Sequence, residues 1–284
     1  MIQSKRAKFY STYISRQNFA LPDTIMFYIL MNPKTAKLYQ KLIKSCKYFF
    51  VKNPVLVISY LFYNCDKWFV DQKPFDLSKL TCKVWITDKL NLCSVKTGNQ
   101  SILPSLMSKF YRCDAKDLLL SNQVLSFHDL SLLISSAKDI SLYNISIKNK
   151  NGSNVALEKV IEIAVKAKSI VIHSNTGLTN TASKAFTELL KIPHFSQLDY
   201  FNMNNIPDTF DIEEFYTHMK ENRKTKFDLK FVRSLSDAYK ARLEEIVDEI
   251  LTTEVLNYKP PLFRFHGLNF EKYMRLSDCS KKFV

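Results

Sequence analysis

Residues 19–53 carry the apolar pattern of two short helices. The first is predicted to begin at Pro22, whose fixed φ suits a first helical turn, and to end at Asn32-Pro33, since proline lacks an amide donor and disfavours helix in the residue before it. Its apolar side chains are Ile25, Ile29 and Leu30. In the second, amphipathic helix the apolar face holds Leu38, Leu42, Ile43 and Cys46, and the other face holds Lys37, Lys41, Lys44 and Lys47.

The most apolar run of the chain is residues 54–63 (PVLVISYLFY). Its ten residues are about half of a membrane span, and we expect a buried helix and no membrane anchor. Asn53-Pro54 separates this run from the helix before it.

A short β-like segment followed by a helical stretch recurs from residue 83 onward at intervals of 22 to 36 residues. The predicted strands are 83–87, 117–121, 139–143, 169–173, 197–201 and 226–230, with 262–266 as a closing strand. The predicted helices between them include 155–167, 182–191, 211–221 and 237–252. This alternation predicts right-handed crossovers and a parallel sheet, either in a solenoid or in a doubly wound α/β domain.

An asparagine stands at the same offset in three of the repeats, at Asn122, Asn144 and Asn202. An inward asparagine satisfies backbone groups at the turn that leaves each strand of a solenoid. This pattern loosely resembles that of leucine-rich repeats, although here one residue, and not two, separates the last apolar strand position from the asparagine. The repeating strand register and the scarcity of glycine favour a solenoid over the doubly wound fold.

Alternate strand residues point to opposite faces, so the open face of the predicted sheet can be listed. One column is Trp85, Leu119, Ser141, Val171, Asp199 and Asp228, and the next is Thr87, Ser121, Tyr143, His173, Phe201 and Lys230. Tyr143, His173 and Phe201 would form an aromatic ladder on adjacent strands, and exposed rings commonly anchor protein partners. The predicted substrate-binding residues are Trp85, Tyr143, His173, Asp199, Phe201 and Lys230. The alternative is that a loop or the C-terminal tail covers these rings.

The composition of the chain excludes several kinds of functional site. The four glycines are widely separated, which excludes a glycine-rich phosphate loop and a dinucleotide fingerprint. The six cysteines form no CxxC pair and the five histidines lie far apart, so neither a metal site nor a cofactor is expected. His173 and Asp199 are a candidate catalytic dyad, but no nucleophile with a recognisable motif accompanies them. We therefore expect a binding protein and not an enzyme.

The net charge of +14 is concentrated at the N-terminus, where residues 1–60 hold ten Lys or Arg and one acidic residue, Asp23. Such an excess favours an acidic partner: a protein, a nucleic acid or a membrane surface. Nucleic acid is the less favoured reading, because no base-stacking motif accompanies the charge. Residues 1–22 lack the apolar run of a signal peptide, which suggests the cytoplasm or the nucleus, with a mitochondrial presequence as the alternative.

Residues 19–53 resemble an F-box. The matching pieces are Leu21-Pro22, the aliphatic Ile25, Ile29 and Leu30, the turn at Pro33, Leu38 and Leu42, and Cys46-Lys-Tyr-Phe49. The chain departs from the family in having no acidic residue in the first helix beyond Asp23. The resemblance implies docking onto a Skp-type adaptor of a cullin–RING ubiquitin ligase, with Leu21, Pro22, Ile25, Ile29, Leu38, Leu42, Cys46 and Phe49 at the contact. The simpler alternative is a helical cap that buries its apolar stripe on the repeats.

The sequence therefore predicts an α/β protein with a basic tail (1–18), an F-box-like helical module (19–65), an irregular leucine-rich-repeat-like solenoid with a parallel sheet (80–270) and a C-terminal tail (271–284). This layout resembles the lineage-expanded F-box-like families of roundworms. The predicted function is that of a substrate receptor which binds an adaptor through the module and a protein target of unknown identity through the repeats. The alternative is a non-enzymatic repeat scaffold unrelated to ubiquitin.

Overall fold

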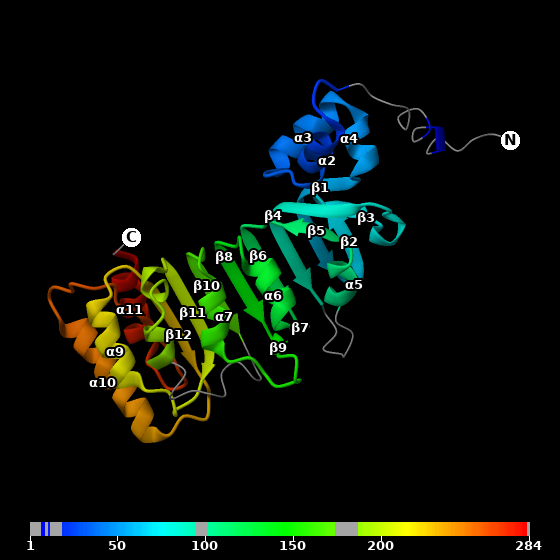
Figure 1. Cartoon of the computed structure of the whole chain (residues 1–284). Coiled ribbons are helices and arrows are strands. Elements are labelled where there is room, and N and C mark those ends of the chain that lie inside the picture. Colours follow the sequence, from blue (N-terminus) through cyan, green and yellow to red (C-terminus); the bar gives the residue numbers. More distant parts are fainter. Residues whose placement is uncertain (1–6, 9–10, 12–18, 95–101, 174–186, 283–284) are drawn as a thin grey trace.

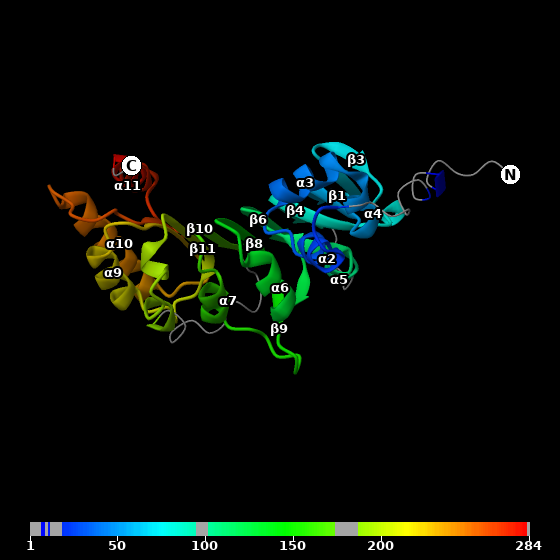
Figure 2. The same cartoon turned by 45° about the horizontal axis from the view of Figure 1, so that its top comes forward.

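A computed structural model of the chain describes residues 7, 8, 11, 19–94, 102–173 and 187–282. It shows a mixed α/β protein built on one large, mostly parallel sheet (Figure 1). Helices α2 (Asp23–Met31), α3 (Ala36–Ser45) and α4 (Lys47–Lys52) gather at one end of this sheet, and α9 (Ile212–Glu221), α10 (Asp237–Thr252) and α11 (Phe270–Lys282) gather at the other (Figures 1 and 2).

The sheet follows the chain order along most of its width. Its parallel strands are β1 (Val55–Asn64), β4 (Lys83–Cys93), β6 (Asp117–Ser121), β8 (Asp139–Tyr143), β10 (Ser169–His173), β11 (Tyr200–Ile206), β12 (Lys226–Phe231) and β13 (Leu262–Arg264). Beyond β1 lie antiparallel β2 (Lys67–Val70) and β3 (Lys73–Phe75). The predicted parallel sheet is thus confirmed.

Short pieces complete the fold. Strand β5 (Phe110–Cys113) pairs with the first half of β4, and β7 (Val124–Ser126) pairs with β9 (Ser146–Lys148) in a separate parallel sheet. The crossovers carry α5 (Leu103–Met107), α6 (Phe127–Ile134), α7 (Leu157–Ile163) and two 3-10 turns, η1 (Leu77–Lys79) and η2 (Phe195–Gln197). The sequence pattern did not predict β2, β3, β5, β7, β9 or α11, all of which are short or strongly amphipathic.

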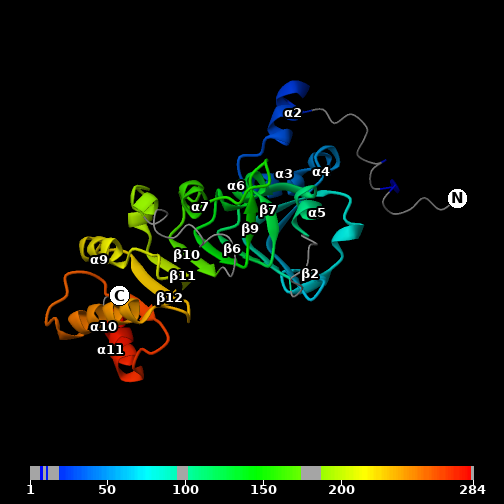
Figure 3. The same ribbon diagram turned by 90° about the horizontal axis from the view of Figure 1, so that it is seen from below.

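One face of the sheet forms the main hydrophobic core. Alternate strand residues such as Leu118, Ile140, Ile170, Phe201 and Phe227 point to this face and are almost fully buried. Apolar residues of α6, α7, α9 and α10 belong to the same cluster, and Figure 3 shows helices along this side. The opposite face, called here the open face, holds partly exposed residues such as Ser141 and Val171.

Helix α7 and strand β13 are shorter than predicted, and the first half of the predicted helix 182–191 lies outside the described residues. Three further elements differ from the predictions. Residues 55–64 are strand β1 of the main sheet and not a buried helix; the strand buries Val55 against the module and Ile58 against the core, so its apolar run has no visible alternation. Strand β11 spans Tyr200–Ile206, whereas residues 197–201 were predicted, because turn η2 occupies Phe195–Gln197. Strand β4 continues to Cys93, beyond its predicted end at Thr87.

Asparagines adopt the left-handed conformation at three strands, directly after β6 and β8 and at a bulge inside β11. Asn122, Asn144 and Asn205 have φ of 54°, 51° and 61°. The Asn122 amide N–H donates to the Tyr143 carbonyl at 2.9 Å and its Nδ2 donates to the Ser94 carbonyl at 2.6 Å, while Asn144 Nδ2 donates to Asn122 Oδ1 at 3.2 Å. The predicted role is confirmed for Asn122, whose side chain satisfies a backbone carbonyl, but not for Asn144, which is exposed and whose side chain bonds the Asn122 side chain and no backbone group among the described residues. Asn202 does not have this role, because it lies inside β11. The register partner of His173 is Asn204, so the asparagine at the equivalent position in β11 is Asn205.

We expect Asn122→Ala to lower the free energy of unfolding by about 2 kcal/mol, since it removes a hydrogen bond and places a residue with a Cβ in a left-handed conformation. Asn122→Gly is expected to cost about 1 kcal/mol less, because glycine adopts positive φ freely. Urea unfolding of the two variants tests this. Equal losses would show that backbone conformation at Asn122 is irrelevant to stability.

Candidate functional site

The helical module of residues 19–53 is built around a small core of its own. Met26 and Leu30 of α2 and Phe49 of α4 are buried together. The partly buried residues around them are Phe19, Leu42, Ile43, Cys46 and Tyr48. Helix α2 begins after Pro22, and α3 is capped by Thr35, whose Oγ1 accepts the Leu38 amide N–H at 3.1 Å. Proline and the threonine cap thus fix both helix starts.

Hydrogen bonds and aromatic packing join the module to the sheet. The Tyr39 hydroxyl donates to the Asn53 carbonyl at 2.6 Å and accepts the Val55 amide N–H at 3.1 Å. Burial raises the pKa of Tyr39 to about 12, so the hydroxyl remains a donor. Tyr39 also packs on Trp85 of β4, with ring centroids 6.4 Å apart. The module is therefore seated on the amino ends of β1 and β4.

Helix α2 exposes a wide apolar face on its other side. The exposed fractions are 45% for Ile25, 63% for Phe27 and 68% for Tyr28, and Met31 is also exposed. Leu21 before the helix and Leu38 of α3 extend this surface, with exposed fractions of 47% and 41%. We call Leu21, Ile25, Phe27, Tyr28, Met31 and Leu38 the module face. A helix that is apolar all round and buried on one side only is typical of a docking element.

The residues predicted to bind an adaptor divide into two groups. Leu21, Pro22, Ile25 and Leu38 are exposed, whereas Ile29, Leu42 and Cys46 are partly buried around the module core. Phe49 is 4% exposed and lies in that core, so its place in the predicted contact is wrong. Phe27, Tyr28 and Met31 were not predicted, because the sequence shows helix periodicity but not which side faces the module core.

Lysines surround the module face. Lys34, Lys37, Lys41 and Lys44 are exposed, and none of them has an ion pair among the residues that the structure describes. Lys37, Lys41 and Lys44 form the exposed lysine face predicted for α3, whereas Lys47, predicted with them, begins α4. Unpaired cations beside exposed apolar side chains fit a partner whose apolar surface has an acidic rim.

The open face of the sheet carries a row of polar and aromatic side chains on five adjacent strands. Register pairs Tyr143 of β8 with His173 of β10, His173 with Asn204 of β11, Asn204 with Lys230 of β12, and Lys230 with Arg264 of β13. We call these five residues the open-face row. Neighbouring parallel strands lie about 4.8 Å apart, so the row spans about 19 Å.

The predicted aromatic ladder is correct for two of its three rings. Tyr143 and His173 pack with ring centroids 4.6 Å apart. Phe201, the third predicted ring, is 1% exposed and points into the core. Strand β11 begins at Tyr200 and not at residue 197, a shift by an odd number of residues. The side chains predicted for one face therefore point to the other, and Asn202 and Asn204 take the open-face positions.

Three further predictions for this surface differ from the structure. Asp199 precedes β11 and lies at the amino edge of the sheet, where it pairs with Lys168 at 3.9 Å and Lys224 at 3.5 Å. Trp85 is fully buried between the module and β5, because the first half of β4 lies beside β5 and not beside β6. The His173–Asp199 dyad is absent, since His173 Nε2 lies 3.2 Å from Asn202 Oδ1.

Hydrogen bonds hold the residues next to the open-face row. Asp228, almost fully buried, accepts from Arg264 Nη2 at 2.7 and 2.8 Å and from the Tyr200 hydroxyl at 3.1 Å. Burial, reinforced by the carboxylate of Asp228, raises the pKa of Tyr200 to about 12. Lys230 is exposed and has no ion pair in the described part of the chain. The row therefore presents one cation that has no internal counter-charge.

Burial, with lesser contributions from Arg264 and Lys230, lowers the pKa of His173. The folded state therefore resists protonation, and we expect the stability contributed by His173 to be lost as the pH falls below about 6.5, the unfolded value. Urea unfolding of wild type and His173→Gln at pH 7.5 and pH 5.5 measures this. The wild type should lose more stability than the variant; an equal loss would exclude His173 as a cause.

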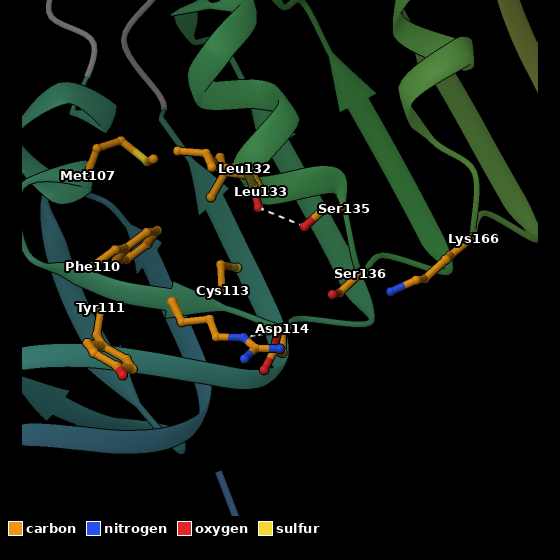
Figure 4. A pocket seen from close by; sticks show the side chains of 11 residues that line it. Met107, Phe110, Tyr111, Cys113, Asp114, Leu132, Leu133, Ser135, Ser136 and Lys166 are labelled. Atoms are coloured by element: carbon orange, nitrogen blue, oxygen red, sulfur yellow. Dashed lines mark hydrogen bonds and ion pairs between the residues drawn. The ribbon is translucent and has the colours of Figure 1, made fainter. Parts of the chain in front are cut away.

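A pocket of about 420 Å³ lies between α5, β5 and α6. Figure 4 shows Met107, Phe110, Cys113, Leu132 and Leu133 around it, with Ser135, Ser136 and Lys166 toward one end. Burial raises the pKa of Cys113 to about 11, so this sulfur is a thiol and a poor nucleophile at neutral pH. Asp114 is engaged by Arg112 Nε at 2.7 Å and Trp85 Nε1 at 2.8 Å. The lining of the pocket is therefore mixed, with apolar side chains at one end and polar or charged side chains at the other.

Within the described residues there is no group of three or more histidine, cysteine or carboxylate side chains arranged to hold a metal ion. In the same residues no helix has the length and apolar character needed to cross a membrane. Comparisons of the chain with family models, curated proteins and solved structures return no match. Function therefore has to be inferred from the residues of this chain.

Proposed function

We propose that this protein is an F-box-like substrate receptor. Residues 19–53 would be the F-box-like module, which docks on a Skp-type adaptor of a cullin–RING ubiquitin ligase. The strand–helix repeats would be an irregular leucine-rich-repeat-like solenoid, which presents a protein target to the ligase. In this proposal the protein has no catalytic activity of its own and works in the cytoplasm or the nucleus.

The exposed module face is the observation that carries this proposal. If α2 only capped the repeats, Leu21 and Ile25 would be buried against them, yet both are about half exposed. Met26 and Leu30 on the opposite side already fill the module core and anchor the helix. The apolar face of α2 thus has no role in the packing of the described chain, which supports a docking role.

The exposed lysines near the module face indicate that its partner is acidic. Lys34, Lys37, Lys41 and Lys44 would attract a partner with acidic residues around an apolar groove, and such attraction increases the rate of association. Skp-type adaptors are an acidic family, which fits this requirement. The departure from the F-box pattern in the first helix, where Asp23 is the one acidic residue, is consistent with the same preference.

Co-purification with a Skp-type adaptor tests the proposal. The two chains, expressed together, should elute as one complex, and its yield should decrease at high salt because exposed lysines contribute to the contact. Failure to recover any adaptor with a folded chain would reject the ubiquitin-ligase role and favour the alternative, a repeat scaffold unrelated to ubiquitin.

Nucleic-acid binding through the basic N-terminal region is the alternative from a different class. The basic segment 1–18 lies almost wholly outside the described residues, so this alternative rests on its charge. Phosphate contacts would make the affinity fall steeply as salt rises. A salt titration against generic duplex DNA should show only weak binding at physiological salt if the receptor proposal is correct.

A further inference from the structure

Asn204, in the middle of the open-face row, has a buried side-chain oxygen without a hydrogen-bond partner. The residue is 7% exposed, and its Oδ1 accepts no hydrogen bond. Leaving a buried polar group unpaired destabilises the folded state. The neighbouring Asn202 is also buried, but it is satisfied by His173 at 3.2 Å. A buried, unsatisfied amide oxygen beside a satisfied Asn202 is typical of a group kept for an external partner.

The surroundings of Asn204 define what this partner must offer. On one side lies Lys230, which is exposed and unpaired in the described part of the chain, and on the other lie the packed rings of His173 and Tyr143. Arg264 is already engaged by Asp228, so it adds little free charge. The row thus offers an amide at its centre, a cation on one side and an apolar surface on the other.

We propose that the open-face row binds an extended, acidic peptide segment of the target protein. The carboxamide of Asn204 carries a donor and an acceptor side by side, and a rotation of this side chain toward the open face on binding presents both to the C=O and N–H groups of a peptide backbone. Lys230 binds an Asp or Glu side chain of that segment, and the Tyr143–His173 pair packs on an apolar side chain. A row of about 19 Å accommodates about six extended residues. This inference rests on the proposed receptor function.

Selection of random peptides displayed on phage tests the proposal. We expect the wild-type chain to enrich peptides that combine Asp or Glu with an aromatic or aliphatic residue. A selected peptide should bind Asn204→Ala about tenfold more weakly, the loss expected for one to two hydrogen bonds. Lys230→Glu should reverse the preference from acidic to basic peptides. Lys166→Glu, a matched charge change on the helix side of the sheet, should leave the affinity unchanged.

The unfolding free energy of the same variant excludes a purely structural role. Because Asn204 is unsatisfied, Asn204→Ala should be as stable as wild type or more stable, whereas an asparagine that supports the fold would destabilise when removed. Weaker peptide binding together with unchanged stability supports the proposal. Enrichment of peptides without acidic residues, affinity unaffected by Asn204→Ala, or binding of a short RNA in place of peptides would overturn it.

Adaptor binding measured on the same variants separates this proposal from the receptor function. Asn204→Ala and Lys230→Glu lie far from the module face and should retain the adaptor complex. Acidic peptides enriched by a chain that binds no adaptor would support the peptide site and reject the ligase role. An adaptor complex without enriched peptides would reject the peptide site alone.

Discussion

Replacement of Trp85 by alanine is expected to lower the free energy of unfolding by about 3–5 kcal/mol, the cost of removing a large buried aromatic side chain. Trp85 is fully buried, and its ring packs on Tyr111 at 5.5 Å and lies under the Arg112 guanidinium at 5.2 Å. It also packs on Tyr39 of the module. The same variant should make the link between Lys52 and Val55 more susceptible to protease, because the module loses its seat on the sheet.

Trp85→Phe is the matched control for this prediction. It retains most of the packing but removes the hydrogen bond from Nε1 to Asp114 at 2.8 Å, so we expect a loss of about 1–2 kcal/mol. Urea unfolding followed by circular dichroism gives both values. A loss below about 1 kcal/mol for Trp85→Ala would contradict the packing of the module on the sheet, since typical surface substitutions have effects of about this size or less.

The double variant Leu21→Asp/Ile25→Asp is expected to reduce adaptor affinity by at least about 100-fold, which corresponds to about 2.7 kcal/mol. Two carboxylates placed on the module face prevent burial of its apolar side chains at an interface. Both residues are already exposed, so the unfolding free energy should change by no more than about 0.5 kcal/mol for each substitution. Titration calorimetry against the purified adaptor, together with urea unfolding, measures both quantities.

Val255→Asp/Phe270→Asp provides a matched control, because it introduces the same charges at exposed apolar residues in the C-terminal half of the chain. This control should bind the adaptor like wild type. If Leu21→Asp/Ile25→Asp unfolds the chain, the module face has a structural role and the cap interpretation gains. If the double variant folds and binds with unchanged affinity, docking through the module face is wrong.

The sequence predicted the strands that have one buried and one open face. In β6, β8 and β10 a polar residue opens a five-residue segment whose second and fourth residues are apolar and buried, so both the bounds and the facing residues follow from this shared pattern. Tyr143, His173 and Lys230 were therefore placed correctly. Strand β1 has apolar residues at both faces, since Val57 packs toward the module and Ile58 toward the core, and its pattern could not distinguish strand from helix.

The candidate site was predicted less completely because its key residues depend on register and on tertiary packing. Leu198 is buried, although it lies before β11, and its apolar character made residues 197–201 resemble a strand. The predicted strand was therefore out of register by an odd number of residues. This placed Phe201 on the open face and left Asn204 out of the predicted site. Phe49 and Phe27 have similar chemistry in the sequence, and only the packing of α4 on α2 shows that Phe49 is internal and Phe27 external.

Amide hydrogen exchange of the chain, alone and with a Skp-type adaptor, tests the central claim most directly. The account predicts that the adaptor slows exchange in residues 21–42, which contain α2 and most of α3, and leaves β8, β10, β11 and β12 unchanged. Protection confined to the repeats, or no protection anywhere at saturating adaptor, would contradict docking through the module face.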